Sequence, residues 1–214
     1  MVRIASFIFS PFSENTYVLY DDTRDCVIID PGCYNDTERA ELADFIAREE
    51  LKPVKLLNTH CHIDHVFGNR FVADKWGLGL EMNKNDLDTL HALVSVGHLY
   101  ELNVEPSPEP VAFLDEGDKV KFGETILEIL FTPGHSKGSI CFYHREQKFV
   151  IGGDVLFHGS IGRSDLPGGD HETLLSSIRN KLFRLPDDFT VFSGHGPETT
   201  IGYEKRSNPF VGEE

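Results

Sequence analysis

Three histidines and an aspartate are crowded into six residues of the run Thr59-His60-Cys61-His62-Ile63-Asp64-His65. Positions 60, 62 and 64 share a parity, so in extended backbone they point the same way, whereas His65 points elsewhere. Two imidazoles two residues apart suit one metal ion, and Asp64 with His65 suits a second. Imidazole and carboxylate together are the ligand set of zinc, iron or manganese. Packed without a metal, these groups would need other partners, because unpaired buried polar groups are costly. Cys61 has the opposite parity and is expected to be structural.

The elements on either side of this run should hold it on a strand-to-helix turn. Residues 53–58 are typical of a short buried strand that begins at a proline. After the run, apolar side chains recur at helical spacing over residues 66–76. The histidine run is therefore expected where the chain leaves a sheet and enters a helix.

Three further helices and several strands are expected in the rest of the chain. Residues 35–50 predict an amphipathic helix, with Asn35 and Glu38 forming a capping box. Residues 83–103 predict a helix that is apolar on more than one face, and residues 171–184 predict one capped near Asp170. Strands are expected within residues 1–30 and at 119–122, 125–131, 140–143, 148–151 and 189–192.

Three other metal-ligating residues each follow a β-rich run and sit among glycines: His135, Asp154 and His195. Strand ends are where loops carry functional groups on a rigid scaffold. Together with the histidine run, these residues supply seven ligands from four loops. Asp30 also follows an apolar run, but before Pro-Gly it is by itself typical of a turn.

Composition limits the classes of function. The chain has 214 residues, 40% of them hydrophobic and 26% charged, as in a soluble globular protein. Its net charge of −15 disfavours a nucleic-acid partner. No apolar run is long enough to span a bilayer, and the N-terminus lacks the pattern of a secretory signal. The four cysteines show no CxxC spacing, which is typical of reduced thiols in a cytoplasmic protein.

A family resemblance rests on these motifs. Asp30, the His60–His65 run, His135, Asp154 and His195 resemble, in order and context, the five motifs of the metallo-β-lactamase superfold. Residues 154–170 and 194–200 resemble the short form of the glyoxalase II (hydroxyacylglutathione hydrolase) group. The resemblance implies an α/β fold, a four-layer αβ/βα sandwich of two mixed sheets, forming a single domain over residues 1–214. It also implies two divalent cations at one rim of the sandwich, with zinc expected and iron or manganese as alternatives.

The resemblance also implies a role for each motif residue. Asp64 and Asp154 are the implied catalytic carboxylates, Asp30 orients the cluster through hydrogen bonds, and Arg163 binds the substrate. The implied ligands are His60, His62 and His135 for the first metal, Asp64, His65 and His195 for the second, and Asp154 bridging both.

The implied reaction is hydrolysis of a small-molecule thioester, such as S-lactoylglutathione, by a metal-bridging hydroxide. A thiol with a pKa of about 8.5 leaves as the thiolate with little help from an acid. The sequence ends at Glu214, without the C-terminal helical domain of longer members, so the thiol carrier stays open. The oligomeric state also stays open. The helix at 83–103 is a candidate lid over the site, with core packing as its alternative.

Other activities of the same fold remain alternatives. A persulfide dioxygenase would hold one iron through His60, His135 and Asp154. A lactone or ester hydrolase and a non-catalytic metal-binding protein are further candidates. A true β-lactamase is disfavoured, because the best-known zinc β-lactamases have a cysteine in place of Asp154 and lack the histidine that corresponds to His65.

Overall fold

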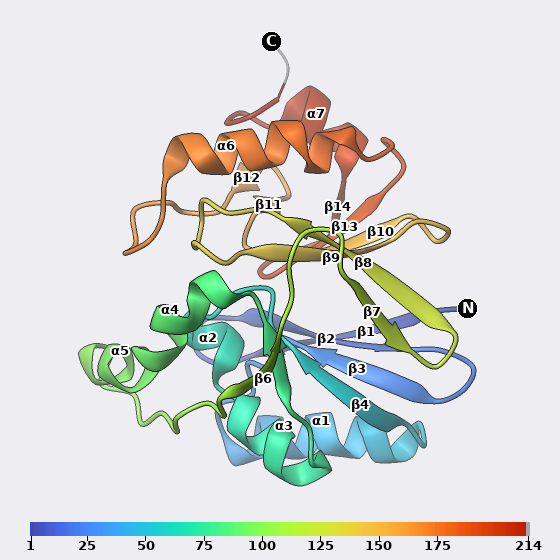
Figure 1. Cartoon of the computed structure of the whole chain (residues 1–214), viewed down its shortest axis with the longest axis vertical. Helices are drawn as coiled ribbons and strands as arrows, with labels where there is room; N and C mark the ends of the chain where they lie inside the picture. Colours follow the sequence, from blue (N-terminus) through green and yellow to red (C-terminus); the bar gives the residue numbers. More distant parts are fainter. Residues whose placement is uncertain (213–214) are drawn as a thin grey trace. The chain divides into compact units, whose positions relative to one another are not determined.

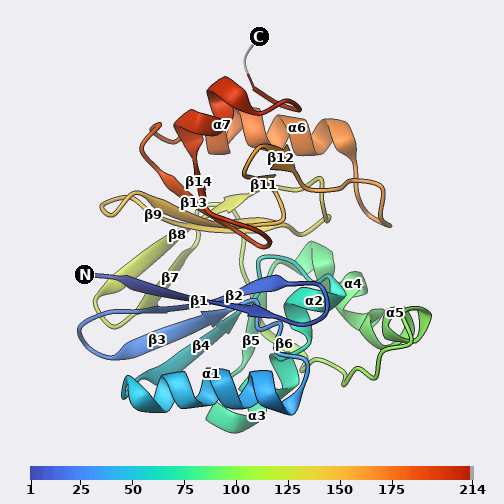
Figure 2. The same cartoon turned by 180° about the vertical axis from the view of Figure 1, so that it is seen from behind.

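The computed structural model describes residues 1–212, which form two compact units. The N-terminal unit comprises Met1–Leu114 with Lys121–Ile126, and the C-terminal unit comprises Asp115–Val120 with the chain from Leu127 onward. The chain forms two six-stranded sheets and flanking helices (Figure 1), seen from behind in Figure 2. This content confirms the predicted α/β fold class. A single domain over residues 1–214 stays a prediction.

The sheet of the N-terminal unit has the strand order β1-β2-β3-β4-β5-β6. Its first three strands pair antiparallel, and the pairs from β3 to β6 are parallel. After Asp25, the central strand β3 is a continuous apolar run that is wholly buried, as expected for a strand covered on both faces. The strands are β1 Arg3–Phe9, β2 Glu14–Tyr20, β3 Asp25–Ile29, β4 Lys52–Leu57, β5 Leu80–Met82 and β6 Pro110–Phe113.

Helices α1 and α3 lie along one face of this sheet (Figure 1). Leu42 of α1 and Val72 of α3 join the same buried cluster as Ile28 and Leu56 of the strands. The predicted capping box at the start of α1 is confirmed, with both reciprocal hydrogen bonds present. The helices of the unit are α1 Asp36–Arg48, α2 Ile63–Val66, α3 Asn69–Trp76, η1 Lys84–Asp86, α4 Leu87–His91 and α5 Leu93–Leu99.

Two expected helices are interrupted. The helix expected over 66–76 begins earlier, as α2, and restarts as α3 after Gly68, whose amide donates to the Pro31 carbonyl at 2.7 Å. A Cβ at Gly68 would lie 2.4 Å from the Cys33 sulfur and 2.8 Å from the Pro31 carbonyl oxygen, so this close approach requires glycine. The helix expected over 83–103 is divided into η1, α4 and α5, with Ala92 at a ψ of −9° between the last two.

The sheet of the C-terminal unit has the order β14-β13-β10-β9-β8-β7. Strands β10 and β13 are parallel neighbours, and β8, β9 and β10 pair antiparallel. Helices α6 and α7 lie along one face of this sheet (Figure 2), and the Asp170 side chain caps α6 as predicted. The elements are β7 Lys119–Phe122, β8 Thr125–Phe131, β9 Ile140–His144, β10 Phe149–Gly153, β11 Leu156–Phe157, β12 Ser160–Ile161, α6 His171–Asn180, η2 Leu182–Arg184, β13 Thr190–Ser193, β14 Thr199–Thr200 and α7 Ile201–Ser207.

Two further expectations concern membrane-spanning helices and the cysteines. Across residues 1–212, every helix is too short or too polar to cross a bilayer. All four cysteines lie within these residues, and they are buried thiols rather than disulfides. Burial raises the pKa of Cys26 and of Cys33 to about 12 in each case. These thiols therefore stay protonated at neutral pH, as the structural interpretation of the cysteines requires.

Candidate metal centre

The N-terminal unit brings Asp30 and the histidine run to the same edge of its sheet. Strands β3 and β4 are parallel neighbours, so their carboxyl ends meet. The Asp30 amide, directly after β3, donates to the Leu57 carbonyl at the end of β4 at 2.9 Å. The loop 58–62 then leads into α2, which confirms the predicted strand-to-helix turn. Ligand-capable atoms of Asp30, His60 and His65 lie within 4.8 Å of one another.

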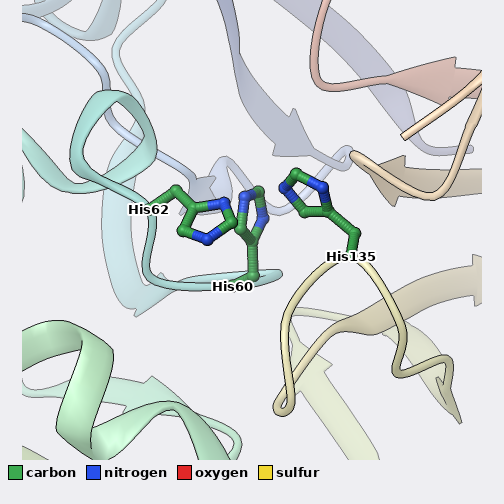
Figure 3. Close-up of side chains that lie close together, drawn as sticks. All are labelled: His60, His62 and His135. Carbon is green, nitrogen blue, oxygen red and sulfur yellow. The ribbon is translucent and has the colours of Figure 1, made fainter. Parts of the chain in front are cut away.

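The imidazole rings on this loop face one another. The ring centroids of His60 and His62 lie 4.8 Å apart in an edge-on arrangement, which Figure 3 shows together with His135 at its own turn. The centroids of His60 and His65 are closer, at 4.1 Å. The parity argument that directs His65 away from His60 is therefore wrong. Parity applies to extended backbone, but the chain turns into α2 after His62 and carries His65 back toward the loop.

The Asp30 carboxylate lies behind these rings and accepts four hydrogen bonds. Its Oδ1 atom receives the Thr59 amide at 2.7 Å and the Asn58 side-chain amide at 3.3 Å. Its Oδ2 atom receives the Thr59 hydroxyl at 2.5 Å and contacts the His65 Nδ1 at 3.1 Å. Asp30 has a φ of 50°, a left-handed conformation that aspartate tolerates better than most residues. Asp30 therefore does more than form the turn that its local sequence predicts, because its carboxylate points into the cluster.

Contact between Asp30 and His65 selects which ring nitrogen is available to a metal. A carboxylate accepts hydrogen bonds, so the His65 Nδ1 carries the proton and its Nε2 carries the lone pair. The Nε2 atom lies 3.8 Å from Oδ2 of Asp64. Carboxylate partners of this kind commonly orient metal-bound histidines. His65 and Asp64 therefore offer one nitrogen and one oxygen donor at a spacing that a single cation could bring together.

Two buried carboxylates that the sequence analysis missed also support the N-terminal half. Asp86 accepts the Cys61 amide at 2.8 Å, so it fixes the backbone between the two loop histidines. Glu14 lies 3.9 Å from the His65 Nδ1, and its other oxygen accepts the Thr16 hydroxyl at 2.9 Å. Burial raises the pKa of Glu14 well above its usual value, against the opposing attraction of His65. No local motif marks either residue, because both come from distant elements.

The C-terminal unit brings His135, Asp154 and His195 together. Asp154 and His195 follow the parallel strands β10 and β13, whose ends are joined by a hydrogen bond from the Gly194 amide to the Gly153 carbonyl at 2.8 Å. Oδ2 of Asp154 lies 3.6 Å from the His135 Nε2 and 3.5 Å from the His195 Nε2. One carboxylate oxygen therefore lies between two imidazole nitrogens.

These spacings fit metal ligation. Two donors about 2.1 Å from one cation, at the tetrahedral angle, lie about 3.4 Å apart. Asp154 has that spacing to each histidine separately, which suits a carboxylate shared by two cations. The donor set of both units, imidazole nitrogens with carboxylate oxygens, also suits zinc, iron or manganese. The residues present therefore fit divalent metals.

Loop geometry fixes the tautomer of His135. Its Nδ1 donates to the Arg163 carbonyl at 2.7 Å, which leaves Nε2 as the available donor atom. The preceding Gly134 has a φ of 130°, and a side chain there would lie 2.2 Å from the Leu174 amide nitrogen of α6. Gly162 passes equally close, since its Cβ would lie 1.9 Å from the Asp154 carbonyl oxygen. Backbone packing thus places His135 against Asp154.

The Arg163 side chain is exposed and paired. Its guanidinium makes a two-pronged ion pair with the Asp165 carboxylate, with both contacts at 2.8 Å. The hydrogen bond from Arg163 lowers the pKa of Asp165 to about 2. The predicted substrate role of Arg163 stays a prediction, while its carbonyl has a clear part in orienting His135.

Comparison with known proteins identifies the family. Residues 10–195 match the metallo-beta-lactamase superfamily, and this chain belongs to that superfamily. It is 41% identical over 202 residues to a protein of Bacillus subtilis named probable metallo-hydrolase YqgX, covering 94% of this chain and 93% of that one. It is also 41% identical over 206 residues to hydroxyacylglutathione hydrolase GloC of Haemophilus influenzae, with the same coverage. The predicted enzyme class, a metallo-hydrolase, is confirmed.

Solved structures confirm the predicted metallo-β-lactamase fold. The crystal structure of the BLEG-1 B3 metallo-beta-lactamase superposes with a TM-score of 0.89 at 37% identity, covering 99% of both chains. That of TTHA1623 in a di-iron-bound form superposes with a TM-score of 0.87 at 35% identity, covering 97% of this chain and 100% of that one. A divalent metal centre is consistent with this likeness and with the local donor sets.

Proposed function

We propose that this protein hydrolyses the thioester of a small acylated thiol, such as S-lactoylglutathione, at a centre of two divalent cations. The observation that carries the proposal is the position of the Asp154 carboxylate oxygen, 3.6 Å and 3.5 Å from the ligand nitrogens of two histidines. That arrangement is what a bridging carboxylate needs. The similarity to a hydroxyacylglutathione hydrolase over nearly the full length of both chains supports the choice of substrate.

The proposed centre takes the seven ligands that the sequence motifs predict. Each ion of a hydrolytic two-zinc centre is typically held by two or three protein ligands and a shared carboxylate. Seven ligands are enough for two such ions. Zinc is the proposed metal, although the di-iron form of TTHA1623 supports iron as an alternative. The proposed first site is His60, His62 and His135, the second is Asp64, His65 and His195, and Asp154 bridges them.

A bound pair of cations supplies a water acidified to a pKa near 7 and an electrophile for the carbonyl oxygen of the substrate. The chain supplies orientation. Asp64, beside the His65 Nε2, accepts a hydrogen bond from the attacking water and aims its lone pair at the carbonyl carbon. Asp30 and the Arg163 carbonyl keep the protons of His65 and His135 on Nδ1, away from the reacting groups.

A thioester suits this set of groups. Attack by the water oxygen would form one C–O bond and release a proton to solvent, and collapse of the adduct would break the C–S bond to give the carboxylic acid and the thiolate. The departing thiolate has an ordinary thiol pKa of about 8.5, so it needs little protonation. An amide would need a general acid near its nitrogen. The carboxylates of Asp64 and Asp154, as metal ligands in this proposal, would be held ionised and would be poor acids.

Arg163 is the proposed contact for a carboxylate of the thiol carrier. A guanidinium fork matches a carboxylate in two-pronged geometry, as its pairing with Asp165 already shows. A substrate carboxylate would take the place of Asp165. That exchange replaces one charge-assisted pair with another, so its cost is small and its specificity is for anionic substrates.

A second candidate is hydrolysis of a β-lactam. The likeness to BLEG-1, which carries the name of a B3 metallo-beta-lactamase and aligns over 99% of both chains, favours it. The aspartate at position 154 and the histidine at position 65 remain arguments against the cysteine-containing zinc β-lactamases. The two activities share a centre and differ in the leaving group.

The test measures metal content and substrate preference on the same purified protein. The proposal expects two equivalents of divalent metal per chain and hydrolysis of S-lactoylglutathione far faster than that of a chromogenic cephalosporin. Asp154→Asn should abolish hydrolysis and lower the metal content. Asp187→Asn, which alters an exposed, ion-paired carboxylate of the same unit, should change neither.

Three results would contradict the proposal. Cephalosporin cleavage without thioester cleavage would support the β-lactam candidate. One iron per chain with oxygen uptake on a persulfide substrate would support a dioxygenase. Full thioesterase activity in Asp154→Asn would remove the bridging carboxylate from the mechanism.

A further inference from the structure

The Thr59 hydroxyl lies between Asp30 and His60. Its Oγ1 atom is 2.5 Å from Oδ2 of Asp30 and 3.1 Å from Nδ1 of His60. All three residues are 1% exposed, so water competes little for these contacts. Hydrogen bonds in such surroundings are strong, and an unmatched donor or acceptor is costly.

Counting hydrogens fixes the direction of this chain of contacts. The Asp30 carboxylate can only accept, and the Thr59 hydroxyl has a single hydrogen, which it donates to that carboxylate. The Thr59 oxygen must then accept in its contact with His60. Only a protonated Nδ1 can donate to it, so the His60 Nε2 carries the lone pair.

We propose that Thr59 is a positioning residue that relays the charge of Asp30 to His60 and selects Nε2 as its metal-binding atom. Asp30 does the same for His65 by direct contact at 3.1 Å. One carboxylate therefore sets the tautomer of two histidines, one directly and one through a hydroxyl. This inference rests on the proposed metal-dependent function and adds a residue that the ligand motif does not contain.

The relay has a matched control in the same unit. Thr125 is also buried, and its hydroxyl donates to Oδ2 of Asp21 at 2.9 Å. Asp21 precedes β3, whereas Asp30 follows it, so the two threonine–carboxylate pairs lie at opposite ends of one strand. The Asp21 carboxylate accepts hydrogen bonds from Thr23, Glu124 and Thr125 and from no histidine of residues 1–212. Replacing Thr125 therefore removes a similar bond and leaves the relay intact.

The experiment reads the tautomer directly. Protein labelled with ¹⁵N-histidine is prepared without metal, and the couplings from the ring carbon-bound protons to Nδ1 and Nε2 are recorded at a pH where the rings are neutral. The variants are Thr59→Val, which keeps the shape and removes the hydroxyl, Thr59→Ser, which restores the hydroxyl, and Thr125→Val. Zinc affinity of each is measured by competition with a chromophoric chelator.

The inference expects His60 in the Nδ1-protonated form in the parent protein, in Thr59→Ser and in Thr125→Val. Thr59→Val should shift His60 toward the Nε2-protonated form, leave His65 unchanged, and weaken zinc binding by about 10–100-fold, as loss of such supporting contacts typically does. Thr59→Ser and Thr125→Val should keep the parent affinity.

An Nε2-protonated His60 in the parent protein would overturn the inference, as would a Thr59→Val protein with unchanged tautomer and affinity. For a variant that does not fold without metal, the same spectrum of the zinc-loaded protein shows which nitrogen carries the proton. No substrate is involved, so the relay can fail while thioester hydrolysis stands. Hydrolysis can equally fail while the tautomers and zinc affinities are as expected.

Discussion

Asp30→Asn should weaken both metal binding and folding, whereas Asp21→Asn should weaken only folding. Asparagine keeps one acceptor oxygen, which serves the Thr59 and Asn58 amides. Its amide group then faces the Thr59 hydroxyl and the His65 Nδ1, which are both donors toward Asp30. Two charge-assisted hydrogen bonds are lost at about 1.5–3 kcal/mol each, which lowers the free energy of unfolding by about 3–6 kcal/mol.

A loss of this size is a large part of the stability of an ordinary domain, about 5–15 kcal/mol. Urea unfolding of metal-free protein, followed by circular dichroism, measures it. Chelator competition measures zinc affinity, expected to fall by about 10–100-fold because two ligand rings lose their orientation. Asp21 is the control, since its buried carboxylate also accepts four hydrogen bonds.

Parent-like zinc affinity in Asp30→Asn, with Asp21→Asn equally destabilised, would refute the reasoning. Asp30 would then be a structural carboxylate like Asp21. Loss of zinc affinity in both variants to the same degree would also refute it, because global destabilisation would explain the effect.

Three further predictions concern other parts of the molecule. Arg163→Ala should raise the KM for an anionic thioester by about 10–100-fold with little change in kcat, as expected for loss of one charge-assisted contact. Steady-state kinetics measure this, and Arg145→Ala, which removes a similar exposed two-pronged ion pair, should leave the KM unchanged. Gly162→Ala, whose Cβ would lie 1.9 Å from the Asp154 carbonyl oxygen, should lose metal in mass spectrometry. Gly152→Ala, whose Cβ would make only ordinary contacts of 3.4 Å or more in the neighbouring strand, should keep it. Cys26 should resist alkylation at neutral pH, because burial raises its folded-state pKa to about 12. Its contribution to the free energy of unfolding is therefore complete below about pH 9 and is lost as pH rises toward 12. Denaturation across that range, with Cys26→Ala for comparison, measures the effect.

The sequence predicted the framework that carries the site because that framework is local. Short apolar runs end at residues with metal-ligating side chains, and parallel pairing of such strands brings their ends together. The Asn35 and Glu38 capping box and the Asp170 cap were likewise predictable from spacing alone. The assignment of seven particular ligands stays a prediction.

Long-range contacts account for what the sequence analysis missed. Gly68 interrupts a helix because the carbonyl of Pro31, 37 residues earlier in the chain, approaches it, and no periodicity shows that. His65 turns toward His60 because the chain bends after His62, which parity cannot anticipate. Glu14 and Asp86 support the cluster from separate elements, and the Thr59 hydroxyl, next to His60 in the chain, meets Asp30 only in the folded protein.

Anomalous diffraction from crystals of the metal-loaded protein, recorded on both sides of the metal absorption edge, tests the central claim most directly. The account predicts two peaks about 3.5–4 Å apart, the separation of two-metal hydrolytic centres, with Asp154 touching both. A single peak, or two peaks of which neither contacts Asp154, would contradict it.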